Sequence, residues 1–131
     1  MSATLIPLLG CDVLAAITPD AYTTTPTGSA IDLAPYAGSM HFILASKAAS
    51  AADTLDGKLT ECDTSGGTYT DVTGGAFTQV TDASTGATLL QTLTIPKSKL
   101  KRFVKAVGTI AGSSVSIPCV MLFIARNKYQ A

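Results

Sequence analysis

The 131-residue sequence contains no tryptophan, and charged residues make up only 14% of it, against about 25% in ordinary soluble domains. A surface so poor in charge predicts that part of it is covered, by self-association or by docking on a larger assembly. A weakly polar surface of Thr, Ser and Ala is the alternative. The absence of tryptophan counts against a carbohydrate-binding module, because such modules usually stack sugars on exposed aromatic rings.

The sequence also lacks the residue clusters that metal sites and active sites need. Its three cysteines stand far apart and form no CxxC pair, so we expect reduced thiols in a protein made in the cytoplasm. The single histidine, His41, cannot build a zinc site, which needs three or four ligands. No phosphate-binding glycine loop, nucleophile elbow or EF-hand spacing occurs. The sequence therefore predicts a protein that is not an enzyme, with no catalytic residue, metal site or cofactor.

Membrane segments are not expected either. No apolar run reaches the roughly 18 residues that suggest a spanning helix. The tetrapeptide at residues 8–11, Leu-Leu-Gly-Cys, resembles a lipoprotein cleavage site. The segment before it has no Lys or Arg and is too short for a signal peptide, so we reject that interpretation.

The residues that are abundant favour β-structure. Threonine accounts for roughly one residue in seven, and its branched side chain favours strands. Apolar or alternating segments are separated by Gly, Asp, Ser and Pro, which mark turns. Strands are expected at residues 39–46, 54–63, 68–72, 77–81, 88–95, 100–109 and 115–126, with a short strand at 12–18 and an extended piece at 30–37. This spacing predicts an all-β fold, an antiparallel β-sandwich or jelly roll of about eight strands.

Proline divides the chain into two parts. Residues 1–37 hold four of the six prolines, which central strands exclude, so we expect an N-terminal arm with loops and one short strand. Residues 38–131 are expected to form the β-sandwich domain. The link at 111–114 is short enough for a hairpin, which favours pairing of the last two strands. These two strands should bury Val104, Ala106, Ile117, Cys119, Met121 and Phe123.

Charge is split along the chain. Residues 1–96 carry nine acidic and two basic residues, and residues 97–131 carry seven basic residues and no acid. On a strand, four lysines of the basic part and Phe103 would share one face. We predict that this cluster contacts another protein through acidic surface. A solvated face is one alternative, and single-stranded nucleic acid is a less expected one. The cluster consists of Lys97, Lys99, Lys101, Arg102 and Lys105.

Two stretches resemble small virion proteins of tailed bacteriophages. The first is LDGKLTECDTSGGTYTDVTGGAFTQVT, from Leu55, and the second is LKRFVKAVGTIAGSSVSIPCVMLFIARN, from Leu100. Such proteins carry a strand of the form xLxxKLxESD, then a glycine turn and T-x-T-D-V-x-G-A-F, and later a KRYVRAV-x-T strand. The resemblance brings no catalytic residues with it.

The resemblance implies a β-sandwich or jelly-roll protein that decorates or cements a capsid. Its partners would be the major capsid protein and copies of itself, as a dimer or trimer. Its place would be the virion, after synthesis in the host cytoplasm. The alternatives are another virion component, such as a head fibre base or a tail protein, and a β-sandwich module that binds nucleic acid or carbohydrate.

Overall fold

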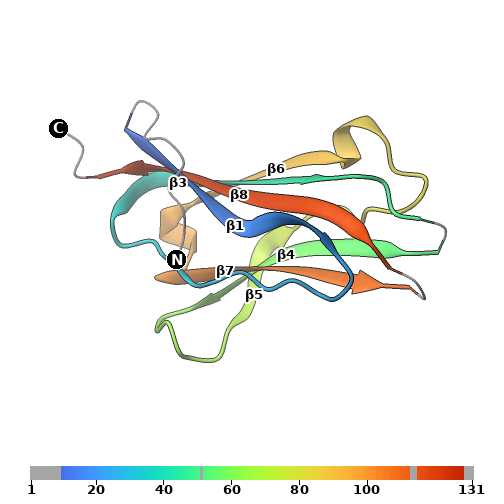
Figure 1. Cartoon of the computed structure of the whole chain (residues 1–131). Helices are drawn as coiled ribbons and strands as arrows, with labels where there is room; N and C mark the ends of the chain where they lie inside the picture. Colours follow the sequence, from blue (N-terminus) through green and yellow to red (C-terminus); the bar gives the residue numbers. More distant parts are fainter. Residues whose placement is uncertain (1–9, 51, 113–114, 129–131) are drawn as a thin grey trace.

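The computed structural model describes residues 10–50, 52–112 and 115–128. Eight strands form two four-stranded antiparallel sheets that pack face to face, as Figure 1 shows. The fold is therefore the antiparallel β-sandwich of eight strands that the strand spacing predicts. Most consecutive strands belong to different sheets, and only β4 and β5 follow each other within one sheet.

Each sheet has a fixed strand order. Sheet A runs β1-β8-β3-β6, and sheet B runs β2-β7-β4-β5. Two short 3-10 turns, η1 and η2, flank β6. The strands of sheet A are β1 (Cys11–Tyr22), β8 (Ile117–Asn127), β3 (Tyr36–Ser46) and β6 (Leu90–Pro96). Those of sheet B are β2 (Ile31–Asp32), β7 (Phe103–Ala111), β4 (Thr54–Cys62) and β5 (Thr70–Ala76). The turns are η1 (Gly86–Thr88) and η2 (Lys97–Lys99).

The last two strands do not form the expected hairpin. Strand β7 lies between β2 and β4 in sheet B, whereas β8 lies between β1 and β3 in sheet A. The prediction of a β7–β8 pair is therefore wrong. Both strands are interior strands of their own sheets, and each turns its buried residues toward the space between the sheets. The short link thus crosses from one sheet to the other instead of joining neighbours.

The N-terminal part contributes more to the sandwich than an arm would. Strand β1 is 12 residues long and pairs with β8 from Cys11 to Tyr22. The short strand expected at 12–18 lies within it. Pro19 sits where the register shifts between Ile17 and Asp20, on an edge strand, where a missing N–H interrupts no ladder. Residues 1–9 of the expected arm lie outside the described residues.

Strand β5 contains a bulge at a glycine. The pairs Lys58↔Ala76 and Thr60↔Asp71 place a bulge in this strand. Gly74 lies in that bulge at φ 75°, a conformation that glycine adopts without strain. The break expected between strands at 68–72 and 77–81 is therefore a bulge inside one strand. In the strand expected at 77–81, Val80 forms an isolated bridge with Leu55, and the amide of Phe77 donates to the carbonyl of Gly57 at 2.8 Å.

The core lies between the two sheets. Met40, Phe42 and Leu44 of β3 face Leu55 and Leu59 of β4, and all five are at most 1% exposed. The Phe123 ring contacts the rings of Tyr36 and Phe42, with both centroid distances 5.2 Å. The six core residues expected from the last two strands are all buried. The three cysteines are free, as expected.

Candidate protein-binding surface

The predicted basic cluster does not lie on one strand face. Lys97 and Lys99 belong to the turn η2, in which the amide of Leu100 donates to the carbonyl of Lys97 at 3.0 Å. Strand β7 begins only at Phe103. Because strand alternation does not apply before that residue, the expectation of a shared face is wrong. The five cations instead occupy four different environments.

Lys97 supports the fold. Its Nζ donates to the carbonyl oxygen of Tyr36 at 2.7 Å and to that of Ala34 at 3.4 Å. Its pKa is lowered, first by burial and then by repulsion from Lys128, while Asp32 opposes the shift. Lys97 therefore joins η2 to the first residue of β3 and to the loop before it.

Arg102 is held by an acidic residue of the neighbouring strand. Its Nε and Nη2 donate to the two carboxylate oxygens of Asp32 at 3.0 and 2.9 Å. This hydrogen bonding lowers the pKa of Asp32. The guanidinium carbon also lies 5.0 Å from the centre of the Phe103 ring. The pair joins the basic part of the sequence to its acidic part, but it is exposed, so it adds only about 0.2–1 kcal/mol to stability.

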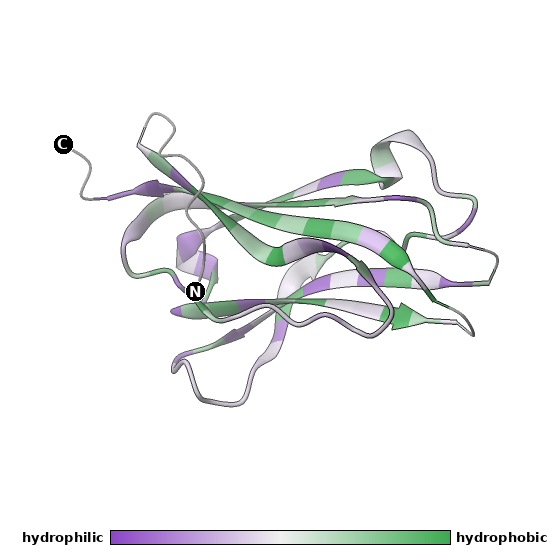
Figure 2. Cartoon of the chain, viewed as in Figure 1, coloured by the Kyte–Doolittle hydropathy of each residue, from purple (hydrophilic) through white to green (hydrophobic). Residues whose placement is uncertain are grey.

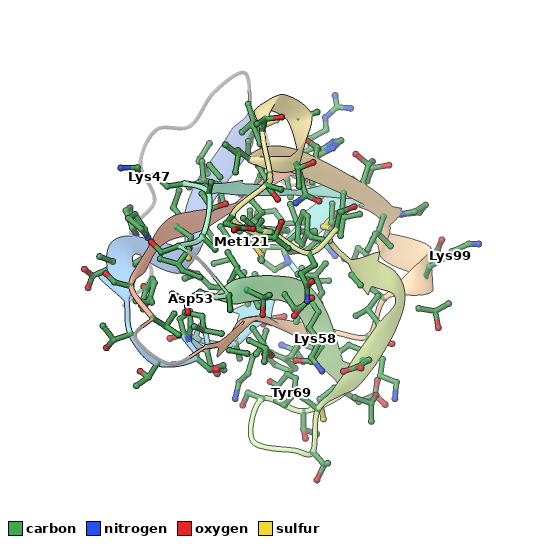
Figure 3. The ribbon with its side chains drawn as sticks, turned by 90° about the vertical axis from the view of Figure 1, so that its right-hand side faces the viewer. Lys47, Asp53, Lys58, Tyr69, Lys99 and Met121 are labelled. Atoms are coloured by element: carbon green, nitrogen blue, oxygen red, sulfur yellow. The ribbon has the colours of Figure 1, made fainter. Side chains whose placement is uncertain are left out.

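Lys105 is engaged on the outer face of sheet B. Its Nζ lies 4.4 Å from the centre of the Tyr69 ring, a favourable cation–π geometry. The Tyr69 hydroxyl donates to the carbonyl of Ser65 at 2.9 Å, and burial raises its pKa. Nearby, Lys58 and Asp71 form an ion pair at 2.9 Å. Figure 3 shows Lys58 and Tyr69 on the same side of the ribbon.

Lys99 and Lys101 are the two remaining residues of the predicted basic cluster. Both are exposed, and the backbone amide of Lys101 donates to the Glu61 carboxylate at 2.9 Å. Across residues 10–50, 52–112 and 115–128, neither ammonium group has a hydrogen-bond or ion-pair partner. We define these two residues as the cationic corner. It is the part of the predicted cluster that is free to contact another molecule.

The sequence could not identify the partners of the other three cations. Asp32 pairs with Arg102 because β2 joins the edge of β7, and β2 is only two residues long. Tyr69 reaches Lys105 from the loop between β4 and β5. No local pattern signals either contact. Both aromatic rings of this region, Tyr69 and Phe103, lie against a cation, which leaves them less suited to stacking on a base or a sugar.

The described residues hold no other chemical constellation. They contain no group of three or more His, Cys, Asp or Glu side chains that could hold a metal ion. His41 shares a hydrogen bond of 3.0 Å between its Nδ1 and the hydroxyl of Thr94. No helix in the described segments has the length and apolar character needed to cross a membrane.

Comparison with known proteins assigns the chain to no family. No protein-family model matches the chain, and no curated protein matches it either. Among solved structures, the chain is similar to a carbohydrate-binding module described as specific for non-crystalline cellulose. The TM-score is 0.42 at 11% sequence identity, and the alignment covers 92% of this chain and 75% of that one.

Proposed function

We propose that this chain is a non-enzymatic structural protein of a tailed-bacteriophage virion, which decorates or cements the capsid by binding between major capsid proteins. The resemblance of residues 55–127 to such virion proteins supports this assembly as the setting. The observation that carries a docking role is the cationic corner, where Lys99 and Lys101 are exposed and have no hydrogen-bond or ion-pair partner among the described residues.

The corner fits an acidic surface on the partner. Arg102 and Lys105, its neighbours in sequence, are engaged by Asp32 and Tyr69, so an incoming carboxylate would meet Lys99 and Lys101 first. Exposed charges of this kind guide association and orientation more than they add affinity. They suit a protein that must find many equivalent positions on a shell.

A capsid-binding assay tests this proposal. Capsids assembled without this protein are titrated with the wild type, with the double variant Lys99→Ala/Lys101→Ala, and with Lys58→Ala as the control. Lys58 is also a solvent-accessible lysine, but it is paired with Asp71 at 2.9 Å on the outer face of sheet B. We expect the double variant to bind about tenfold more weakly, at about 0.5–1 kcal/mol per lost contact, and the control to bind normally.

Salt provides a second readout. Because moderate ionic strength screens exposed charges beyond about 8–10 Å, wild-type binding should weaken with added salt, and the double variant should be less sensitive. Unchanged capsid occupancy of the double variant would contradict the proposal. Tight, salt-dependent binding of the wild type to single-stranded DNA would instead favour the nucleic-acid alternative.

A further inference from the structure

The outer face of sheet A has an apolar centre, bordered toward β6 by the polar side chains of His41, Thr92 and Thr94. Along β8, Cys119, Met121 and Phe123 are buried, and the residues between them point away from the core and stay partly exposed. The register sets Leu122 beside Ile43 of β3 on one side and opposite Ala15 of β1 on the other. We call this surface the apolar face. Its central residues are Ala15, Ile43, Ala45, Val120, Leu122 and Ile124.

The apolar face continues to the edge of the sheet. Leu90 of β6 pairs with Ala45 and is 62% exposed, the only large hydrophobic side chain in the described segments that is so open. At the same end lies a shallow hollow of about 450 Å³. Pro19, Pro118 and Val120 are among its apolar lining residues, and it also has one charge of each sign, from Asp20 and Lys47. The hollow shares Ala45 and Val120 with the apolar face, so the two form one continuous surface.

Charge distinguishes this face from the other outer face of the sandwich. Sheet B directs Lys58, Asp71 and Lys105 outward, and two of them form an ion pair. On sheet A, charged residues such as Asp20 and Arg126 lie only toward the ends of the strands. Figure 2 shows this difference, since β8 is green over most of its length, whereas β4 alternates between green, white and purple.

We infer that two copies of this chain pack through their apolar faces in a two-fold symmetric dimer. An isologous interface sets the same patch against itself, and an uncharged patch can do this without like-charge repulsion. With about 3.4 Å per residue and about 4.8 Å between strands, the four-stranded face measures about 25 by 19 Å. Its projected area is about 475 Å² per partner, or about 950 Å² for the two together, which lies near the roughly 1,000 Å² in total at which a specific interface begins.

The mode of packing follows from sheet geometry. Sheets stacked face to face lie about 10 Å apart with interdigitating side chains, and both partners here offer branched aliphatic side chains at the centre. In the dimer, the two sandwiches would form four layers with both copies of sheet A inside. The two cationic corners would lie beside the interface and not within it, because Lys99 belongs to η2, beyond the end of β6, and Lys101 precedes β7 of sheet B.

Analytical ultracentrifugation of the full chain tests the inference. We expect the wild type to sediment as a dimer at tens of micromolar. Leu122→Lys places a charge at the centre of the face in both copies and should weaken the dimer by at least about 100-fold. Val107→Lys is the matched control, because Val107 is a partly exposed outward residue of β7 on sheet B. Circular dichroism verifies that each variant is folded.

Each outcome of the sedimentation experiment supports or overturns the inferred dimer. A dimer that Leu122→Lys dissociates and Val107→Lys preserves would support the inference. If Leu122→Lys does not fold, the milder Ile43→Thr, which keeps β-branching, takes its place and should weaken the dimer in the same direction. A wild-type monomer would overturn the inference, and so would a dimer insensitive to both changes in the face. If the wild type is monomeric and a variant without residues 1–9 dimerises, the chain's own N-terminal segment covers the face instead.

Discussion

Replacing Phe123 by alanine tests the centre of the sandwich. Phe123 is fully buried and lies on β8, between Leu14 of β1 and Phe42 of β3 in the sheet register. Its ring meets the edge of Tyr36 at an interplanar angle of 73° and tilts by 45° against Phe42. The substitution thus removes the ring on which the aromatic part of the core packs.

The expected loss is about 3–5 kcal/mol in the free energy of unfolding, which combines lost burial with the cavity left behind. The value should lie in the upper part of that range. Each aromatic pair adds about 0.5–1.5 kcal/mol beyond burial, and β8 is held by hydrogen-bonded neighbours on both sides, which limits collapse around the cavity. Against a total stability of about 5–15 kcal/mol for a domain, the variant should be marginal.

Guanidinium unfolding followed by circular dichroism measures the loss, at one fixed protein concentration because self-association would stabilise the folded state. Val107→Ala serves as the control, since Val107 lies on the same kind of interior strand but points outward. We expect it to cost about 1 kcal/mol or less. A loss below about 1 kcal/mol for Phe123→Ala would refute the reasoning, because the ring could then not be packed as described.

The strand positions and part of the core could be predicted because they depend on local sequence patterns. The alternation of β8, with Ile117, Cys119, Met121 and Phe123 at one parity, predicted its buried face directly. Glycine, aspartate and proline between the apolar segments located most strand ends. These signals act within a few residues of one another, so the strand count and the core of the last two strands followed from sequence.

The assignment of strands to sheets could not be predicted in the same way. Loop length suggested a β7–β8 hairpin, yet a short link can join neighbours in one sheet or cross between two. The choice depends on which long-range partners bury the most apolar surface. Strand β8 is apolar on both faces and takes a place between β1 and β3, at a separation along the chain that no local pattern records.

The candidate surface shows the same limit. The lysine spacing predicts one basic face only if these residues follow the two-residue period of a strand. The turn η2 breaks that period, and the contacts of Arg102 and Lys105 depend on Asp32 and Tyr69, which come from distant parts of the sequence. The apolar face, by contrast, can be recognised from the sequence of β8. Val120, Leu122 and Ile124 lie between buried residues, and a strand that is apolar at both parities must cover two faces.

Two further predictions concern the packing and the pH dependence of the sandwich. A Cβ at Gly28 would overlap the carbonyl oxygen of Ala16, so Gly28→Ala should cost about 1–3 kcal/mol in denaturant unfolding. Gly66→Ala, which meets nothing within 4 Å, should cost much less, and equal losses would contradict the packing of this loop. Tyr36 is buried and donates to the Asp12 carboxylate at 3.0 Å, and burial followed by this contact raises its pKa to about 12 from 10.0. The neutral phenol is therefore favoured in the folded chain, and its contribution is complete below about pH 10, where the tyrosine of the unfolded chain is also protonated. Between about pH 10 and 12, Tyr36 ionises in the unfolded chain but stays largely neutral in the folded chain. This stabilises the unfolded chain, so the free energy of unfolding should fall by about 2–3 kcal/mol over that window. Tyr36→Phe should remove this part of the decline, so that the stability difference between wild type and variant narrows as pH rises through the window. An unchanged difference in unfolding free energy between wild type and Tyr36→Phe, measured at about pH 9 and at about pH 11.5, would contradict a raised pKa of Tyr36 in the folded chain.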